Sequence, residues 1–202
     1  MAKKPHNSTV KPRKSPRQRR SEATVDSILE AAARILETHG FAGYTTNAVA
    51  SLAGVSIGSL YQYFPTKEAI TASLITRESK ELWQDIAAID LHADGQAPLH
   101  ALVQAAVEHQ LKRPALARIL DLEEVRLSEP GSANELNVEL AGVVRHCIVA
   151  AGYSADSPHK ISDVVAIIKG MVDGAGQRGE TDKVALAKRV GHAVLGYLIC
   201  SN

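Results

Sequence analysis

Residues 45–64 read TTNAVASLAGVSIGSLYQYF, and this stretch decides the fold. It holds two short segments with helical apolar spacing, at about residues 46–53 and 57–63. A hydroxyl residue precedes each segment, Thr45 the first and Ser56 the second, and its oxygen can accept from the free amides of a helix start. The stretch therefore predicts two short, separately capped helices in succession.

The spacing inside this stretch predicts how the two helices meet. Ala50 is small enough for two backbones to approach where the helices cross, and Gly54 tolerates the positive φ of a tight turn between them. Leu60 supplies an apolar anchor that locks the second helix against the first. This order of small residue, glycine and apolar anchor is the spacing of a helix-turn-helix.

The second short helix then has an outward face of small and hydrogen-bonding residues, as a helix that enters a DNA major groove requires. Gln62 can make a two-point contact with adenine, and Tyr61 can reach a phosphate or a thymine methyl group. The alternative is a small-residue helical hairpin buried in an ordinary bundle.

With these residues in place, the sequence resembles the tetracycline-repressor (TetR/AcrR) family of bacterial transcription regulators, most closely over about residues 21–70. The resemblance is carried by Thr45-Thr46, Ala53-Gly54-Val55-Ser56, Gly58, Leu60-Tyr61, Tyr63-Phe64 and Lys67-Glu68. It implies a homodimer whose recognition helices enter successive major grooves of a partly palindromic operator in double-stranded DNA. The DNA-contacting residues that it implies are Thr45, Thr46, Ser56, Gly58, Ser59, Tyr61, Gln62, Tyr63 and Lys67.

Charge is distributed unevenly along the chain. The net charge is +1, with 23 Lys and Arg against 22 Asp and Glu, yet residues 1–20 carry eight of the bases and no acid. Three prolines and no apolar periodicity in this segment predict a disordered basic arm. Since the recognition helix has no Lys or Arg, we expect the arm to supply much of the nonspecific attraction to DNA. The alternative is a solvated tail without a partner.

The rest of the chain repeats the helical spacing without any alternating strand pattern, which predicts an all-α protein of about nine helices. Helix breaks occur at glycine- and proline-containing segments. We expect a helix-turn-helix DNA-binding domain at residues 21–68 and an effector-binding and dimerisation domain at 69–202. The expected helices outside the short pair cover about residues 21–39, 67–91, 99–112, 115–127, 133–151, 161–172 and 181–200.

Two apolar stripes near the C-terminus predict helices covered on more than one side. Either they are buried within one chain, or they form a four-helix interface in a homodimer, as the resemblance implies. The predicted interface residues are Ile161, Val164, Val165, Ile168, Val172, Val190, Val194, Tyr197 and Leu198. The helices between would surround a pocket for a small-molecule effector, with candidate residues Trp83, His109, Asp121, Glu124, Cys147 and Met171.

Several classes of protein are not expected. The two cysteines and eight histidines have no metal-ligand spacing, and no phosphate loop or catalytic motif occurs, so we expect no metal, no cofactor and no enzyme. No apolar run is long enough to cross a membrane, and the cysteine usage fits the cytoplasm. The hypothesis is a sequence-specific repressor released from its operator by an effector. Its alternatives are an architectural DNA-binding protein without effector and a small helical enzyme using Glu123 or Glu124.

Overall fold

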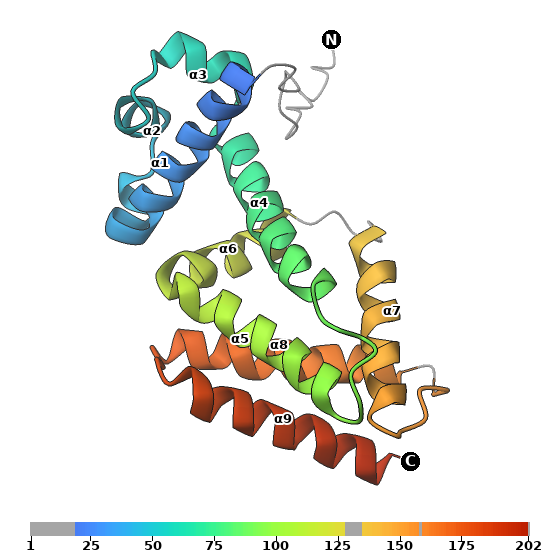
Figure 1. The fold of residues 1–202 in the computed structure, drawn as a ribbon. Coiled ribbons are helices and arrows are strands. Elements are labelled where there is room, and N and C mark those ends of the chain that lie inside the picture. Colours follow the sequence, from blue (N-terminus) through green and yellow to red (C-terminus); the bar gives the residue numbers. More distant parts are fainter. Residues whose placement is uncertain (1–18, 128–134, 158, 202) are drawn as a thin grey trace, which may run out of the picture. The chain divides into compact units, whose positions relative to one another are not determined.

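The computed structural model describes residues 19–127, 135–157 and 159–201, and within these ranges the chain is helical with no strand. The predicted arm falls outside the described residues except for residues 19 and 20, which begin the first helix. The helices, labelled in Figure 1, are α1 Arg19–Gly43, α2 Thr46–Leu52, α3 Ile57–Tyr63, α4 Lys67–Ala87, α5 Ala97–Lys112, α6 Pro114–Leu127, α7 Glu135–Ala150, α8 Lys160–Gln177 and α9 Lys183–Cys200.

The chain divides into two compact units. The N-terminal unit consists of Met1–Ser79 together with Ile119–Leu127, and the C-terminal unit consists of Lys80–Arg118 together with Ser128–Asn202. Helices α4 and α6 therefore each contribute residues to both units. The predicted boundary near residue 68 does not anticipate this division, because the first half of α4 and the end of α6 cluster with the short helix pair.

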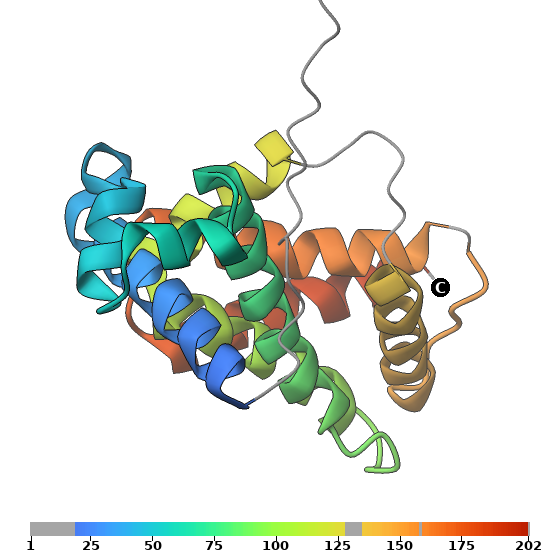
Figure 2. The same ribbon diagram turned by 90° about the horizontal axis from the view of Figure 1, so that it is seen from above.

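In the N-terminal unit, α1 packs across α2, and α2 packs on α3 (Figures 1 and 2). The buried face of α1 repeats at helical spacing, so one side of the helix is removed from water while the other is solvated. Gly40 has φ 59° and kinks α1 before its last residues, which fits the expected glycine stop at this point. The core side chains of this unit include Ile28, Ala32, Leu36, Val49, Leu60, Phe64, Ile70 and Leu74.

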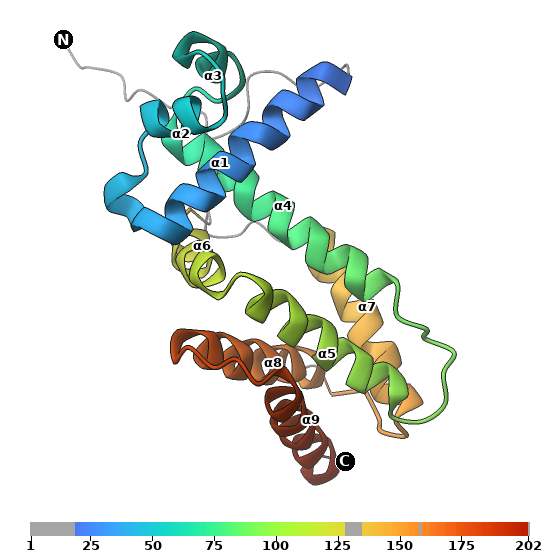
Figure 3. The same ribbon diagram turned by 60° about the vertical axis from the view of Figure 1, so that its left-hand side comes forward.

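In the C-terminal unit, α5, α8 and α9 pack on one another and α7 packs against α5 and α8 (Figures 1 and 3). Apolar residues three and four apart on each helix meet in a single core, which is what an amphipathic helix needs to leave water. The fully buried members include Leu99 and Val107 of α5, Val144 and Ile148 of α7, Val164 and Val172 of α8, and Leu186, Val190, Val194 and Leu198 of α9.

The largest difference from the sequence-based ranges lies in α8. We expected the helix to end near residue 172 because several glycines follow, but it continues to Gln177. Gly176 is buried against Gln110 of α5, and a Cβ there would lie 3.3 Å from the Gln110 side-chain nitrogen. Close packing of two helices thus outweighs the weak helix propensity of glycine. The helix ends where Gly179 adopts φ 73°.

Candidate DNA-binding interface

The two short helices are formed by local interactions that the sequence encodes directly. The Thr45 hydroxyl oxygen accepts from the Ala48 amide at 3.1 Å and caps α2, while Ser56 Oγ accepts from the Ser59 amide at 3.0 Å and caps α3. Gly54 has φ 69° in the turn, and the Val55 amide donates to the Ala50 carbonyl at 3.0 Å. Both caps and the turn hold the second helix at a fixed angle to the first.

Tyr44 anchors this helix pair to α4. Its side chain is 1% exposed, and its hydroxyl lies 3.2 Å from Thr71 Oγ1 and 3.5 Å from the Lys67 carbonyl oxygen, to which it donates. Burial raises the pKa of the Tyr44 phenol to about 12, with smaller contributions from the carboxylates of Glu68 and Glu123. The Lys67 ammonium lies 5.5 Å from the centre of the Tyr44 ring, a cation–π distance. The start of α4 is thereby fixed against the segment that leads into α2.

The outward face of α3 is polar, but its side chains differ in how their hydrogen bonds are used. Tyr61 is 43% exposed, and its hydroxyl lies 3.2 Å from Thr46 Oγ1 of α2. Ser56 Oγ and Ser59 Oγ are 2.9 Å apart. The side chain of Gln62 is exposed and makes no hydrogen bond within the described part of the chain. The serines are therefore partly engaged by the cap, whereas the Gln62 amide keeps its full donor and acceptor capacity.

Gly58 is exposed and is the second residue of α3. A Cβ built on it would meet nothing closer than Ser56 Oγ at 3.9 Å, and its φ is not in the left-handed region. Glycine is less favourable than alanine by up to about 1 kcal/mol in a helix interior, whereas Gly58 lies in the first turn of α3. The bare backbone at this exposed position leaves room for a close approach from outside the chain.

All nine predicted DNA-contacting residues lie in the N-terminal unit. Thr45 and Ser56 use their hydroxyl oxygens for the helix caps, and Tyr63 and Lys67 are half-buried beside the exposed residues of α3. Sequence reasoning missed Tyr44, which positions α4. A lone aromatic residue directly before a cap threonine was the available signal.

The predicted effector residues are divided between the two units. Trp83, Cys147 and Met171 belong to the core of the C-terminal unit, whereas Asp121 and Glu124 fall in the N-terminal unit. Cys147 is fully buried, and desolvation raises the pKa of its thiol to about 11. His109, Asp121 and Glu124 each have interaction partners within the chain. The set of six stays a prediction.

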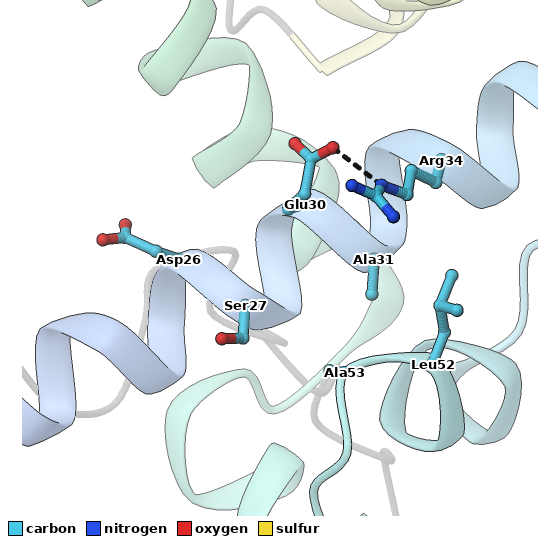
Figure 4. A pocket seen from close by; sticks show the side chains of 7 residues that line it. All are labelled: Asp26, Ser27, Glu30, Ala31, Arg34, Leu52 and Ala53. Atoms are coloured by element: carbon cyan, nitrogen blue, oxygen red, sulfur yellow. Dashed lines mark hydrogen bonds and ion pairs between the residues drawn. The ribbon is translucent and has the colours of Figure 1, made fainter.

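A surface groove of about 420 Å³ lies elsewhere, between α1 and the end of α2 (Figure 4). On one side Glu30 is bonded to Arg34, whose Nε donates at 3.0 Å, and on the other Leu52 is 53% exposed. Glu30 also lies 3.6 Å from the Arg77 guanidinium of α4. No predicted effector residue lines this groove, whose wall is completed by Asp26, Ser27, Ala31 and Ala53.

The predicted dimer interface needs correction at six positions. Their side chains are at most 7% exposed in the single chain because α5, α8 and α9 cover them, so they have almost no surface left for a partner. The six are Val164, Ile168, Val172, Val190, Val194 and Leu198. Ile161, Val165 and Tyr197 keep partial exposure, although Tyr197 donates to Asp163 Oδ2 of α8 at 2.5 Å, a bond that raises the pKa of the phenol.

Metal ligands and membrane-spanning helices are both missing from the described part of the chain. Its residues include no group of three or more His, Cys, Asp or Glu side chains that could hold a metal ion. None of its helices combines the length and the apolar character that crossing a bilayer requires.

A capped helix pair with an exposed polar second helix, joined to further helices, defines a helix-turn-helix DNA-binding protein. Comparison with known proteins agrees with this assignment of a helix-turn-helix. The family model described as bacterial regulatory proteins, tetR family, matches residues 28–74. Residues 28–74 therefore resemble the N-terminal region of this family, in agreement with the resemblance found in the sequence.

Relatives and solved structures extend the comparison. An uncharacterised HTH-type transcriptional regulator of Mycobacterium tuberculosis is 37% identical over 68 residues, covering 34% of each chain. The nucleoid occlusion factor SlmA of Glaesserella parasuis is 31% identical over 110 residues, covering 54% of this chain and 52% of its own. The chain thus spans about a third to a half of these curated relatives. A tetR-family regulatory protein from Rhodococcus RHA1 has the same fold, with TM-score 0.71, 19% identity and coverage of 87% and 96%.

Proposed function

We propose that the chain is a sequence-specific DNA-binding transcriptional repressor rather than an enzyme, and that it acts in the cytoplasm. The observation that carries the proposal is the capped α2–α3 pair, whose second helix exposes Tyr61 and Gln62 and leaves the backbone bare at Gly58. Hydrogen-bonding side chains on an exposed helix of this motif can read base edges in a major groove. The nine predicted DNA-contacting residues remain part of the proposal.

The proposed protein is a homodimer, because two linked recognition helices are needed to bind both half-sites of a palindromic operator. With the six buried residues withdrawn, the faces that support an interface are the outer sides of α8 and α9. Val184 and Ile199 of α9 are 81% and 62% exposed although they are apolar. Gly170 on α8 and Gly196 on α9 are also exposed and would let helices of a second copy approach closely.

The proposed repressor is released by a small-molecule effector that binds in the C-terminal unit. An effector can shift the equilibrium only by the difference between its affinities for the DNA-bound and the free state. Operator binding and effector binding must therefore weaken each other by the same factor. An effector that binds equally well with and without operator would contradict this part of the proposal.

A second candidate function is DNA binding without effector control. The match to proteins named nucleoid occlusion factor, over 54% of this chain, is the observation that favours it. The match covers about half of those proteins, so their role as a whole does not carry over to this chain.

The deciding experiment recovers fragments of the source genome that the purified full-length protein retains in about 150 mM salt, where nonspecific phosphate contacts are weakened. A few fragments that share an inverted repeat are the expected result, and their flanking genes narrow the class of effector. Indiscriminate recovery would favour an architectural protein. Recovery of no DNA would contradict both functions.

A further inference from the structure

We propose that the groove between α1 and the end of α2 is a docking site for residues 9–14 of the basic arm, which exchange between this groove and DNA. The occupant is a segment of this chain that lies outside the described residues. The docking itself goes beyond the proposed function, whereas its effect on operator binding rests on that function.

The groove has an acidic wall and an apolar wall (Figure 4). Asp26 and Glu30 lie one turn apart on α1 and form the first wall. The second wall carries Leu52 at the end of α2, which is 53% exposed although it is apolar. A groove of this kind fits an extended peptide segment that has basic side chains on one side and an aliphatic side chain on the other.

The carboxylates of α1 are not equally available to a partner. Glu30 accepts from Arg34 Nε at 3.0 Å and lies 3.6 Å from the Arg77 guanidinium. Asp26 is exposed and makes no hydrogen bond or ion pair within the described part of the chain, and the same holds for Glu22. Residues four apart lie on the same side of a helix, so Asp26 and Glu22 offer two carboxylates to one bound segment.

The arm has the complementary sequence. Residues 9–14 read TVKPRK, with three bases and no acid. Val10 is the one large aliphatic residue among residues 2–18. Proline at positions 12 and 16 favours an extended chain over a helix. The segment therefore combines the basic and the aliphatic side chains that the two walls require.

The length of chain before α1 allows these groups to meet. Asp26 lies about 10 Å beyond Arg19 along α1, at a rise of 1.5 Å per residue. An extended segment advances about 3.3 Å per residue. If the chain reverses over residues 15–18 and returns along α1, Arg13 comes level with Glu22 and Lys11 comes level with Asp26.

The alternation of side chains in an extended segment then satisfies both walls at once. Lys11 and Arg13 are two residues apart, so they point to the same side, toward the carboxylates of α1. Val10 points to the opposite side, where Leu52 of α2 is exposed. The bases that dock in the groove are the ones that the arm would otherwise offer to phosphates, so groove and DNA compete for them.

The first test needs no DNA and uses the full-length protein labelled with nitrogen-15. The variant Lys11→Glu/Arg13→Glu reverses the two docking bases, so we expect the backbone amide signals of Ser27, Ala31 and Leu52 to shift relative to wild type. The matched control Lys3→Glu/Lys4→Glu makes the same change of charge outside the docking segment and should leave these signals in place. Unchanged groove signals with the first variant, or equal shifts with both, would overturn the docking.

The second test measures affinity for an operator fragment by fluorescence anisotropy. Asp26→Asn removes an exposed carboxylate of the groove and should raise the affinity about two- to fivefold, the range of one exposed ion pair, because the arm is released to the DNA. In the Lys11→Glu/Arg13→Glu background the gain should disappear. A gain of the same size in both backgrounds would mean that Asp26 repels DNA directly, and would overturn the exchange.

The two tests separate the docking from the proposed function. If the wild-type protein selects no operator, the proposed function fails, while the amide signals still decide whether the arm docks. Groove signals that ignore the arm variant but shift when operator is added would assign the groove to DNA and overturn the docking. Far-ultraviolet circular dichroism and a melting temperature within about 2 °C of wild type establish that each variant is folded.

Discussion

Replacing Gly58 by alanine should stabilise the protein and weaken its binding to DNA at the same time. In the free chain the added methyl group meets only Ser56 Oγ at 3.9 Å, an ordinary contact. Alanine is favoured over glycine by about 0.5–1 kcal/mol in a helix interior, which is the upper range for Gly58 in the first turn of α3. For a chain of 202 residues that range corresponds to a rise in melting temperature of about 1–4 °C.

On the operator, the same methyl group would have to fit where the backbone of α3 comes close to the groove. Overpacking by one methyl group in a tight contact costs about 1–3 kcal/mol, which is on the order of a 5- to 150-fold decrease in affinity. Thermal unfolding and anisotropy on one operator measure the two effects. Gly142→Ala on α7 is the control, because Gly142 is also an exposed helical glycine and a Cβ there meets nothing within 4 Å. It should give the stabilisation without the weaker binding.

The outcome that refutes this reasoning is a Gly58→Ala protein that is stabilised and binds the operator as tightly as wild type. DNA would then not approach the chain at Gly58. A variant that is not stabilised would refute the other half, by revealing that the glycine has a structural role in the free protein.

Three further predictions concern stability, assembly and the arm. Burial raises the pKa of the Tyr44 phenol to about 12, so the folded state favours the neutral phenol. The resulting stabilisation is complete below pH 10 and disappears as the pH rises through 12, so the wild-type free energy of unfolding should fall by about 2–3 kcal/mol between about pH 10 and 12. Tyr44→Phe should abolish this decrease. Urea unfolding across that range measures the difference, which vanishes if the phenol is not buried. Ile199→Lys should yield a monomer by light scattering at micromolar concentration, whereas Val149→Lys, on a 58% exposed residue of α7, should not; a dimeric Ile199→Lys protein would place the interface elsewhere. Deleting residues 2–20 should weaken binding to all DNA sequences alike. It should also flatten the slope of log affinity against log salt concentration by about one unit for each phosphate that the arm neutralises. An unchanged slope would mean that the arm does not touch phosphate.

The sequence predicted the fold class, the family and the helix-turn-helix correctly, because their signals are local. A cap residue and the amide that it serves lie three positions apart, as with Thr45 and Ala48, so a short window contains the whole interaction. The turn at Gly54 is similarly encoded by one residue type at one position. The predicted DNA-contacting residues stay predictions, although all of them lie in one unit.

Features that depend on distant residues could not be predicted in this way. Apolar periodicity on α8 and α9 indicates that a face is buried but not which chain covers it, so Val164 and Val190 were assigned to a partner while their own unit buries them. The bond between Thr46 and Tyr61 joins two helices whose relative rotation no single window fixes. The end of α8 packs through Gly176 against Gln110, on another helix, which a local window of sequence does not contain.

The division of the chain into units has a consequence for how it can be cut and recombined. The chain passes between the units at residues 79–80, 118–119 and 127–128, so neither unit is a contiguous segment. A fragment that stops at Ser79 would lack the buried side chains of Leu120 and Glu123, and the surfaces that they cover would be open to water. Transfer of the helix-turn-helix to another protein by simple fusion would therefore yield a less stable domain than the one in this chain. For the same reason, proteases should not release the two units as separate, intact pieces.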